Sequence, residues 1–158
     1  MTFAARCLIL ACGNTLREDD GVGPFLADWA EEHWRDDARV RVICDHQWTP
    51  DMAEEVAAAE VVIFVDCALD QTPGEIVLCE LSSAPLKPGL VTHHLGAAEL
   101  LRVAEDLYRK QPRRACLLTV GAGSIELGEG LSDAVRAALP DAKVLLHQTV
   151  NQLLADSI

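Results

Sequence analysis

One stretch near the start of the chain constrains the fold most: residues 8–23, which read LILACGNTLREDDGVG. Its apolar half stops at Gly13 and Asn14, and a short apolar run that ends at glycine indicates a buried strand. The second half carries Asp19 and Asp20 and then opens an amphipathic helix. In an open α/β sheet, ligands bind beyond the carboxyl ends of the strands. This strand–turn–helix unit therefore predicts that the two aspartates lie where such a fold keeps its chemistry.

The rest of the sequence supplies the other elements of such a sheet. Apolar and β-branched runs predict five strands, at residues 7–12, 39–44, 61–65, 75–81 and 115–120. Helical spacing and caps predict helices that begin near residue 23, span 50–59 and 95–110, and follow Ser132, with Pro140 expected to break or kink the last.

The order of these elements indicates an α/β fold, a three-layer α/β/α sandwich around a five-stranded mixed sheet. No helix fits between the third and fourth strands, so we expect the fourth strand to be antiparallel to the third.

Composition narrows the class of protein. A chain of 158 residues that is half hydrophobic and 24% charged is expected to form a single globular domain over residues 1–158. The net charge of −12 would repel a phosphate backbone, which argues against nucleic acid as a partner. No apolar run reaches the ~18 residues that span a bilayer, and charges resume at Arg17, so we expect a cytoplasmic protein without a membrane partner.

Three polar residues are candidates for chemistry. Asp20 follows the first strand, Asp66 ends the third, and His93 closes the loop before the third helix. If the first and third strands are neighbours, these carboxylates lie about 5 to 10 Å apart. Two carboxylates and an imidazole suit nickel, zinc or manganese.

Each residue also has a structural interpretation. Asp19 and Asp20 can cap the first helix, Asp66 can be a turn residue, and His93 can simply begin a helix. His46 follows the second strand at the same edge and is interpreted as a solvated loop residue. The six cysteines show no CxxC spacing and are expected to be reduced and mostly buried, with Cys12 and Cys67 notable as strand-end residues beside polar loops: Cys7, Cys12, Cys44, Cys67, Cys79 and Cys116.

Familiar enzyme motifs do not fit. GNTLREDDGVG is not GxGxxG, which weakens a dinucleotide site, and there is no GxSxG elbow. A cysteine peptidase using Cys12 or Cys67 is disfavoured, because no histidine is identifiably placed beside either.

The motifs taken together resemble those of the hydrogenase maturation endopeptidases. They are GNTLREDDGVG, VDC at residues 65–67, HHLG at 93–96, and the later VGAGSIELGEGLS, in that order and spacing. The resemblance implies a twisted mixed sheet between helices, with the fourth strand beside the fifth. It also implies an enzyme that trims a C-terminal peptide from the precursor of a nickel-iron hydrogenase large subunit after nickel insertion.

The resemblance assigns the metal contacts to Asp20, Asp66 and His93, with Asp20 and Asp66 as the catalytic candidates. The nickel then belongs to the substrate, with zinc or cadmium as surrogates, and no resident cofactor is implied. The sequence departs from many members at residues 45–53, DHQWTPDMA, where a Gly-Gly-Thr turn is common. Residues 47–51 are similar instead to the proteases of NAD-linked hydrogenases, and Ser124 replaces a frequent proline.

Two mechanisms and two other functions remain open from the sequence. A nickel ion can polarise the scissile carbonyl or position a water, or Asp20 or Asp66 can act as general base. The same three residues would also suit a non-catalytic nickel chaperone or sensor. A small-molecule hydrolase on a similar fold is the third hypothesis.

Overall fold

The computed structural model describes residues 5–83 and 95–156. Its helices and strands follow in this order: β1 (Cys7–Cys12), the short 3-10 helix η1 (Glu18–Gly21), α1 (Val22–His33), β2 (Val40–Asp45), the 3-10 helix η2 (Pro50–Met52), α2 (Ala53–Ala58), β3 (Val61–Ala68), β4 (Ile76–Glu80), α3 (Ala97–Tyr108), β5 (Arg114–Gly121) and α4 (Asp133–Ala155).

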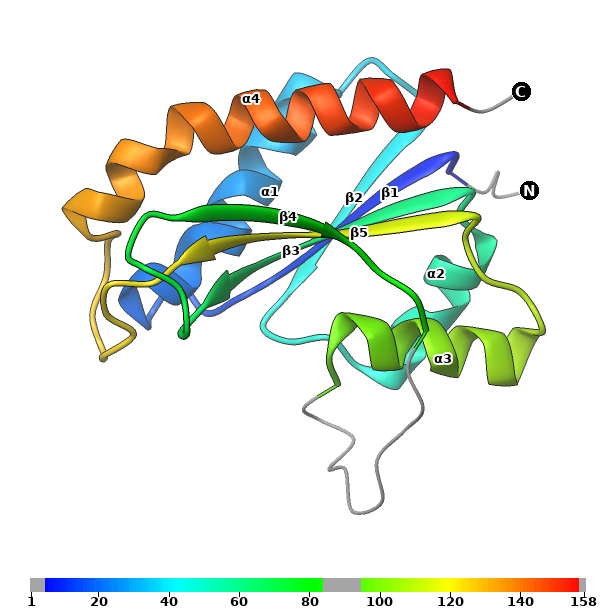
Figure 1. Cartoon of the computed structure of the whole chain (residues 1–158), viewed down its shortest axis with the longest axis horizontal. Coiled ribbons are helices and arrows are strands. Elements are labelled where there is room, and N and C mark those ends of the chain that lie inside the picture. The colour runs from blue at the N-terminus through cyan, green and yellow to red at the C-terminus, as the bar shows by residue number, and fades with distance from the viewer. Residues whose placement is uncertain (1–4, 84–94, 157–158) are drawn as a thin grey trace.

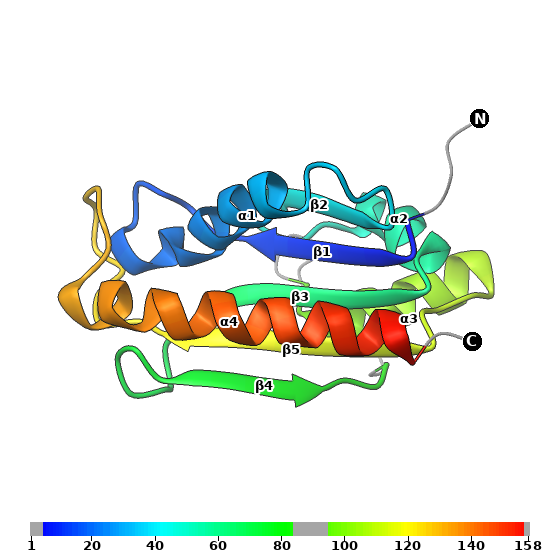
Figure 2. The ribbon, with the colours of Figure 1, turned by 90° about the horizontal axis from the view of Figure 1, so that it is seen from above.

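The strands form one sheet in the order β2-β1-β3-β5-β4. The first four of these run parallel, and β4 pairs antiparallel with β5 at the edge. This confirms the predicted mixed sheet and the place of the fourth strand beside the fifth (Figure 2). The carboxyl ends of β1 and β3, which precede the candidate residues, are therefore neighbours at one edge.

Helices cover both faces of the sheet, as Figure 1 shows. On one face, α1 and α4 bury side chains such as Leu26 and Leu146 against Ile63 of β3. On the other, α2 and α3 pack against alternate residues such as Phe64. The run of residues 61–65 is buried on both faces, as its lack of polar residues predicted.

The break that was considered at Pro140 is absent. Pro140 neither ends α4 nor divides it, since the helix continues from Asp133 to Ala155. A proline costs one backbone hydrogen bond, which the long buried face of α4 offsets, and Pro140 itself is exposed. Thr49, the residue before η2, makes no cap with its side chain, because its hydroxyl donates to Asp51. The cap predicted at Ser132 is present, with Oγ accepting from Val135 N–H at 3.4 Å.

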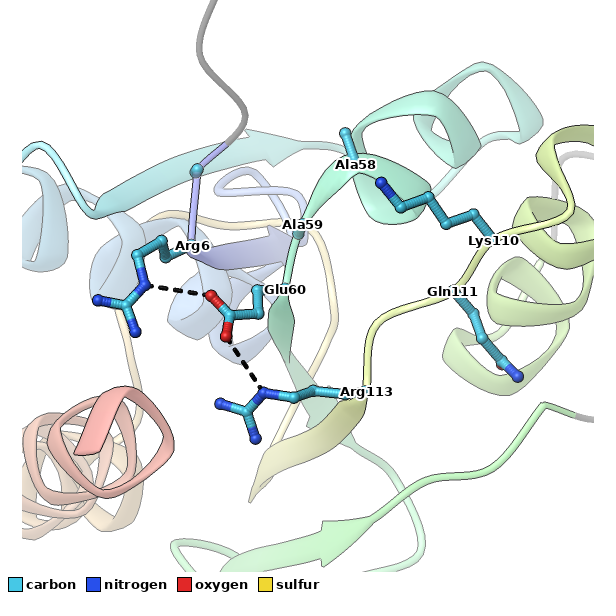
Figure 3. Close-up of a pocket in the computed structure, with 8 residues that line it drawn as sticks. Arg6, Ala58, Ala59, Glu60, Lys110, Gln111 and Arg113 are labelled. Carbon is cyan, nitrogen blue, oxygen red and sulfur yellow. Dashed lines mark hydrogen bonds and ion pairs between the residues drawn. The ribbon is translucent and has the colours of Figure 1, made fainter. Parts of the chain in front are cut away.

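An ion-pair network lies at the end of the sheet where the parallel strands begin, opposite their carboxyl ends (Figure 3). The Glu60 carboxylate pairs with Arg6 at 3.1 Å and with Arg113 at 3.4 Å. The two guanidinium groups also donate to the carbonyl oxygens of Leu154 and Leu153, near the end of α4. Because the last carbonyls of a helix lack intrahelical partners, this network anchors the C-terminal end of α4.

In the two described stretches of the chain, every helix is too short or too polar to cross a membrane.

Candidate functional site

Asp20 is set in place by the turn that follows β1. Its Oδ2 accepts a 2.7 Å hydrogen bond from the backbone N–H of Asn14. Gly13 has a φ of +152°, and a side chain there would collide with the carbonyl oxygen of Asp20. Glycine is therefore required for the turn to fold back closely enough to bring Asp20 over the end of β1.

Asp66 and Cys67 lie near the C-terminal end of β3. The strand continues to Ala68, so Asp66 lies within it, one register step beyond Val65, which pairs with Ala11 of β1. Cys67 joins the two carboxylates. Its backbone N–H donates to Asp66 Oδ1 at 2.8 Å, and its thiol donates to Asp20 Oδ1 at 3.2 Å.

Burial and charge make Asp66 a carboxyl group that is unusually easy to protonate. Burial raises its pKa to about 6, and the nearby Asp20 carboxylate adds to the rise. Hydrogen bonds from Cys67 N–H and the Cys12 thiol act in the opposite direction. A carboxyl group with a pKa near neutrality is suited to proton transfer.

The two neighbouring thiols are not activated nucleophiles. Burial, followed by the nearby Asp66 carboxylate, raises the pKa of the Cys12 thiol far above its ordinary value. Burial and the hydrogen bond to Asp20 do the same for Cys67. A reactive cysteine needs a lowered pKa, so the geometry supports the expectation that neither thiol is a peptidase nucleophile.

Asp19, the neighbour of Asp20, has different partners and serves the fold. It is fully buried and accepts four hydrogen bonds, from the N–H groups of Gly123, Ser124 and Ser132 and from the Ser132 hydroxyl. Burial alone would raise the pKa of Asp19, but the bonds from Ser132, Gly123 and Ser124 outweigh it and hold the pKa below its usual range. Asp19 therefore fixes the loop of residues 121–130 and the start of α4 beside Asp20.

The donor atoms of Asp20, Asp66 and Cys67 lie within 4.8 Å of one another. Two carboxylate oxygens and a sulfur are a set that suits a borderline ion such as zinc or nickel better than magnesium or calcium. Of the predicted residues, Asp20 and Asp66 are thus brought together, while His93 lies outside the described residues. His46 is exposed after β2, as expected.

Sequence reasoning missed Cys67 as a partner of the carboxylates. Its position directly after Asp66 was the available signal, but alternation along a strand points the two side chains to opposite faces. The contact arises because η1 places Asp20 beyond the end of the sheet. There the Asp20 carboxylate accepts from the Cys67 thiol.

Solved structures share this fold over nearly the whole chain. The hydrogenase maturating endopeptidase HybD from E. coli has a TM-score of 0.74 at 20% identity, covering 93% of each chain. A hydrogenase maturation protease HycI from Thermococcus kodakarensis has a TM-score of 0.69 at 21% identity, covering 96% of this chain and 94% of its own.

A third structure has higher identity. The hydrogenase 2 maturation peptidase from Thaumarchaeota archaeon SCGC_AB-539-E09 is 27% identical, with a TM-score of 0.68 and coverage of 92% of this chain and 98% of its own. A comparison with curated proteins gave no match.

The family model for hydrogenase maturation proteases, HycI, matches residues 45–148. The matched region includes Asp66 and His93 and begins after Asp20. The match covers about two thirds of the chain, and the structural match to HybD extends over 93% of it. On this evidence the chain belongs to the hydrogenase maturation protease family, a family of peptidases.

Proposed function

We propose that this chain removes a C-terminal peptide from the precursor of a nickel-iron hydrogenase large subunit after nickel has been inserted. Membership of the maturation protease family supports the class of reaction and of substrate. One observation in this chain supports the proposal beyond family membership. Asp20 and Asp66 lie close together at the carboxyl ends of the neighbouring strands β1 and β3.

In this proposal, the metal arrives with the substrate. Asp20, Asp66 and His93 contact a nickel ion that the precursor already holds, and they complete its coordination shell. The family resemblance contributes His93, and the donor chemistry of the two carboxylates supports their part. Since the precursor supplies the other ligands, the protease needs only weak affinity for free metal.

Two routes to hydrolysis fit this arrangement. The nickel can polarise the scissile carbonyl or bind the attacking water. Alternatively, Asp66 can take the proton of the water, and its raised pKa of about 6 supports that role. Asp20 is held by Asn14 and Cys67 on its two oxygens, which favours a fixed contact with the ion.

The test is a gel assay of precursor processing with nickel-loaded and nickel-free precursor. We expect cleavage of the loaded form alone, and free zinc should not rescue the nickel-free form. Asp20→Asn and Asp66→Asn keep the size of each side chain but remove a charge, so both should fold and lose processing. Asp36→Asn, an exposed residue just after α1, is the matched control and should process normally.

Three outcomes would each reject a part of the proposal. Trimming of nickel-free precursor in a chelator would leave carboxylate catalysis without a role for nickel. Normal processing by Asp20→Asn would remove that residue from the site. Tight binding of nickel by the chain alone, without cleavage of any precursor, would instead identify a nickel chaperone or sensor.

A further inference from the structure

Two histidines meet between α1 and α4, the helices that cover one face of the sheet. His33 is the last residue of α1, and His147 lies in the second half of α4. Their ring nitrogens, His33 Nε2 and His147 Nδ1, are 2.8 Å apart. Asp20 lies just before the start of α1, so a helix of about 18 Å separates this pair from the carboxylates described above.

Tryptophan rings fix both imidazoles. Trp29 stacks on His33 with ring centroids 4.6 Å apart and an interplanar angle of 16°. Trp34, which is buried, presents its ring edge-on to His33 at 4.6 Å and stacks on His147 at 6.1 Å. The imidazoles are therefore held in place before any ligand arrives, which reduces the entropy that a ligand would have to fix.

The second nitrogen of His147 also has a partner. Asn151, one helical turn further along α4, places its carboxamide nitrogen Nδ2 3.0 Å from His147 Nε2. Turning the amide over by 180° exchanges this nitrogen for the oxygen, which then accepts at the same position. His147 Nε2 then carries the hydrogen, and the lone pair of Nδ1 is directed towards His33. This is the arrangement of a metal-bound histidine, which usually donates its other N–H to an oxygen.

The spacing of the two nitrogens suits a single ion. With metal–nitrogen distances of about 2.0–2.1 Å, two imidazole nitrogens lie about 2.9 Å apart at a right angle and about 3.4 Å apart in a tetrahedron. The observed 2.8 Å is about a tenth of an ångström below the right-angle value. His33 is exposed, so water has access to the remaining positions of the ion.

We propose that His33 and His147 bind one divalent ion of the zinc, nickel and copper class, with Asn151 orienting His147. Imidazole is a favoured ligand for these ions. The net charge of −12 raises the local concentration of cations around the chain. The ion takes the place of the hydrogen that the two nitrogens share. His33 then carries its hydrogen on the other ring nitrogen, Nδ1, so both imidazoles bind the ion in their neutral form. The site is separate from the one proposed to contact the precursor.

The test is a titration with zinc chloride. Binding is measured by calorimetry and by the shifts of the histidine ring signals in NMR spectra. Asp66→Asn serves as the background, because it weakens binding at the carboxylate group. We expect the signals of His33 and His147 to shift together and to saturate at one ion per chain. His33→Gln and His147→Gln should each lower this affinity by about tenfold or more. His46→Gln removes an exposed histidine elsewhere and should leave it unchanged.

Asn151→Ala separates a metal site from a simple hydrogen bond between the rings. It should lower the zinc affinity by about tenfold, because the orientation of His147 is lost. The proposal is rejected if zinc leaves both ring signals unmoved, or if the His33→Gln and His147→Gln variants bind zinc as the background does. Melting temperatures measured without metal show whether each variant is folded, and any variant that is not folded is replaced by Asn151→Ala.

Discussion

At the scale of single residues, the candidate site depends on a thiol that neither accepts nor transfers a proton in the proposed reaction. Cys67 donates to both carboxylates, through its N–H to Asp66 and its Sγ–H to Asp20. The Asp20 bond lies between side chains 47 positions apart, so no local pattern could predict it. What the sequence could predict was the pair of aspartates, because each follows or ends an apolar run.

Replacing the thiol tests whether it orients Asp20. Cys67→Ser keeps a donor of similar size, and we expect processing close to that of the parent chain. Cys67→Ala removes the donor, and we expect kcat/KM for nickel-loaded precursor to fall by about tenfold, since a hydrogen bond to a charged group is lost. The loss should appear in kcat more than in KM.

Cys79→Ala is the control, because Cys79 is exposed on β4. Equal activity of Cys67→Ser and Cys67→Ala would show that the thiol packs without orienting the carboxylate.

At the scale of elements, strands were easier to predict than the contacts between loops. The β-branched run of β3 and the alternating pattern of β2 identify strands because burial fixes the side-chain period. Asp19 was given a local interpretation, as a cap of the first helix, yet its partners lie 104 to 113 positions away. The fold of residues 121–130 around a carboxylate has no period, so sequence reasoning predicted a loop and no more.

Asp19→Asn should destabilise the protein although it barely changes the size of the side chain. An amide presents N–H groups to donors of the loop and of Ser132, and some of these buried groups lose their acceptor. We expect a loss of about 2 kcal/mol, or a fall in Tm of about 4–8 °C near neutral pH.

Acid should reduce this difference between Asp19→Asn and the parent chain. The pKa of Asp19 is below its ordinary value of 3.8 in the folded chain, so its charge stabilises the fold above that pH. The contribution is lost as the pH falls through the lower, folded pKa. Thermal melts across the acid range should therefore converge, and a difference that grows with acidity would contradict this account.

At the scale of the molecule, the two edges of the sheet have separate tasks. The carboxyl edge gathers Asp20, Asp66 and Cys67, while the opposite edge holds α4 through Arg6, Glu60 and Arg113 (Figure 3). The overall topology could be predicted from the order of the elements. The order of the elements could not predict that β4 pairs with β5, because an antiparallel strand can join the sheet beside more than one other strand. The family resemblance supplied this pairing.

Glu60→Gln should separate stability from activity. It removes the charge between the two arginines, and these partly exposed pairs are worth about 1 kcal/mol together after screening by solvent. We expect a fall in Tm of about 2–4 °C that becomes smaller at high salt, with processing activity unchanged.

Asp106→Asn breaks an exposed pair with Arg102 on α3 and should change Tm less. Loss of processing by folded Glu60→Gln would mean that the two edges are coupled.

The contact between Asp19 and Ser132 also has a consequence for synthesis of the chain on the ribosome. Ser132, which donates to Asp19, is synthesised 113 residues after it. The Asp19 carboxylate therefore lacks this partner when β1, α1 and β3 have already left the ribosome. Until residues 123–132 are made, the Asp19 carboxylate lacks all four of its hydrogen bonds, so η1, which also carries Asp20, is less firmly fixed. A nascent chain can therefore form much of its sheet while it is still unable to act on a precursor. We therefore expect processing activity to appear only when the start of α4 has been synthesised.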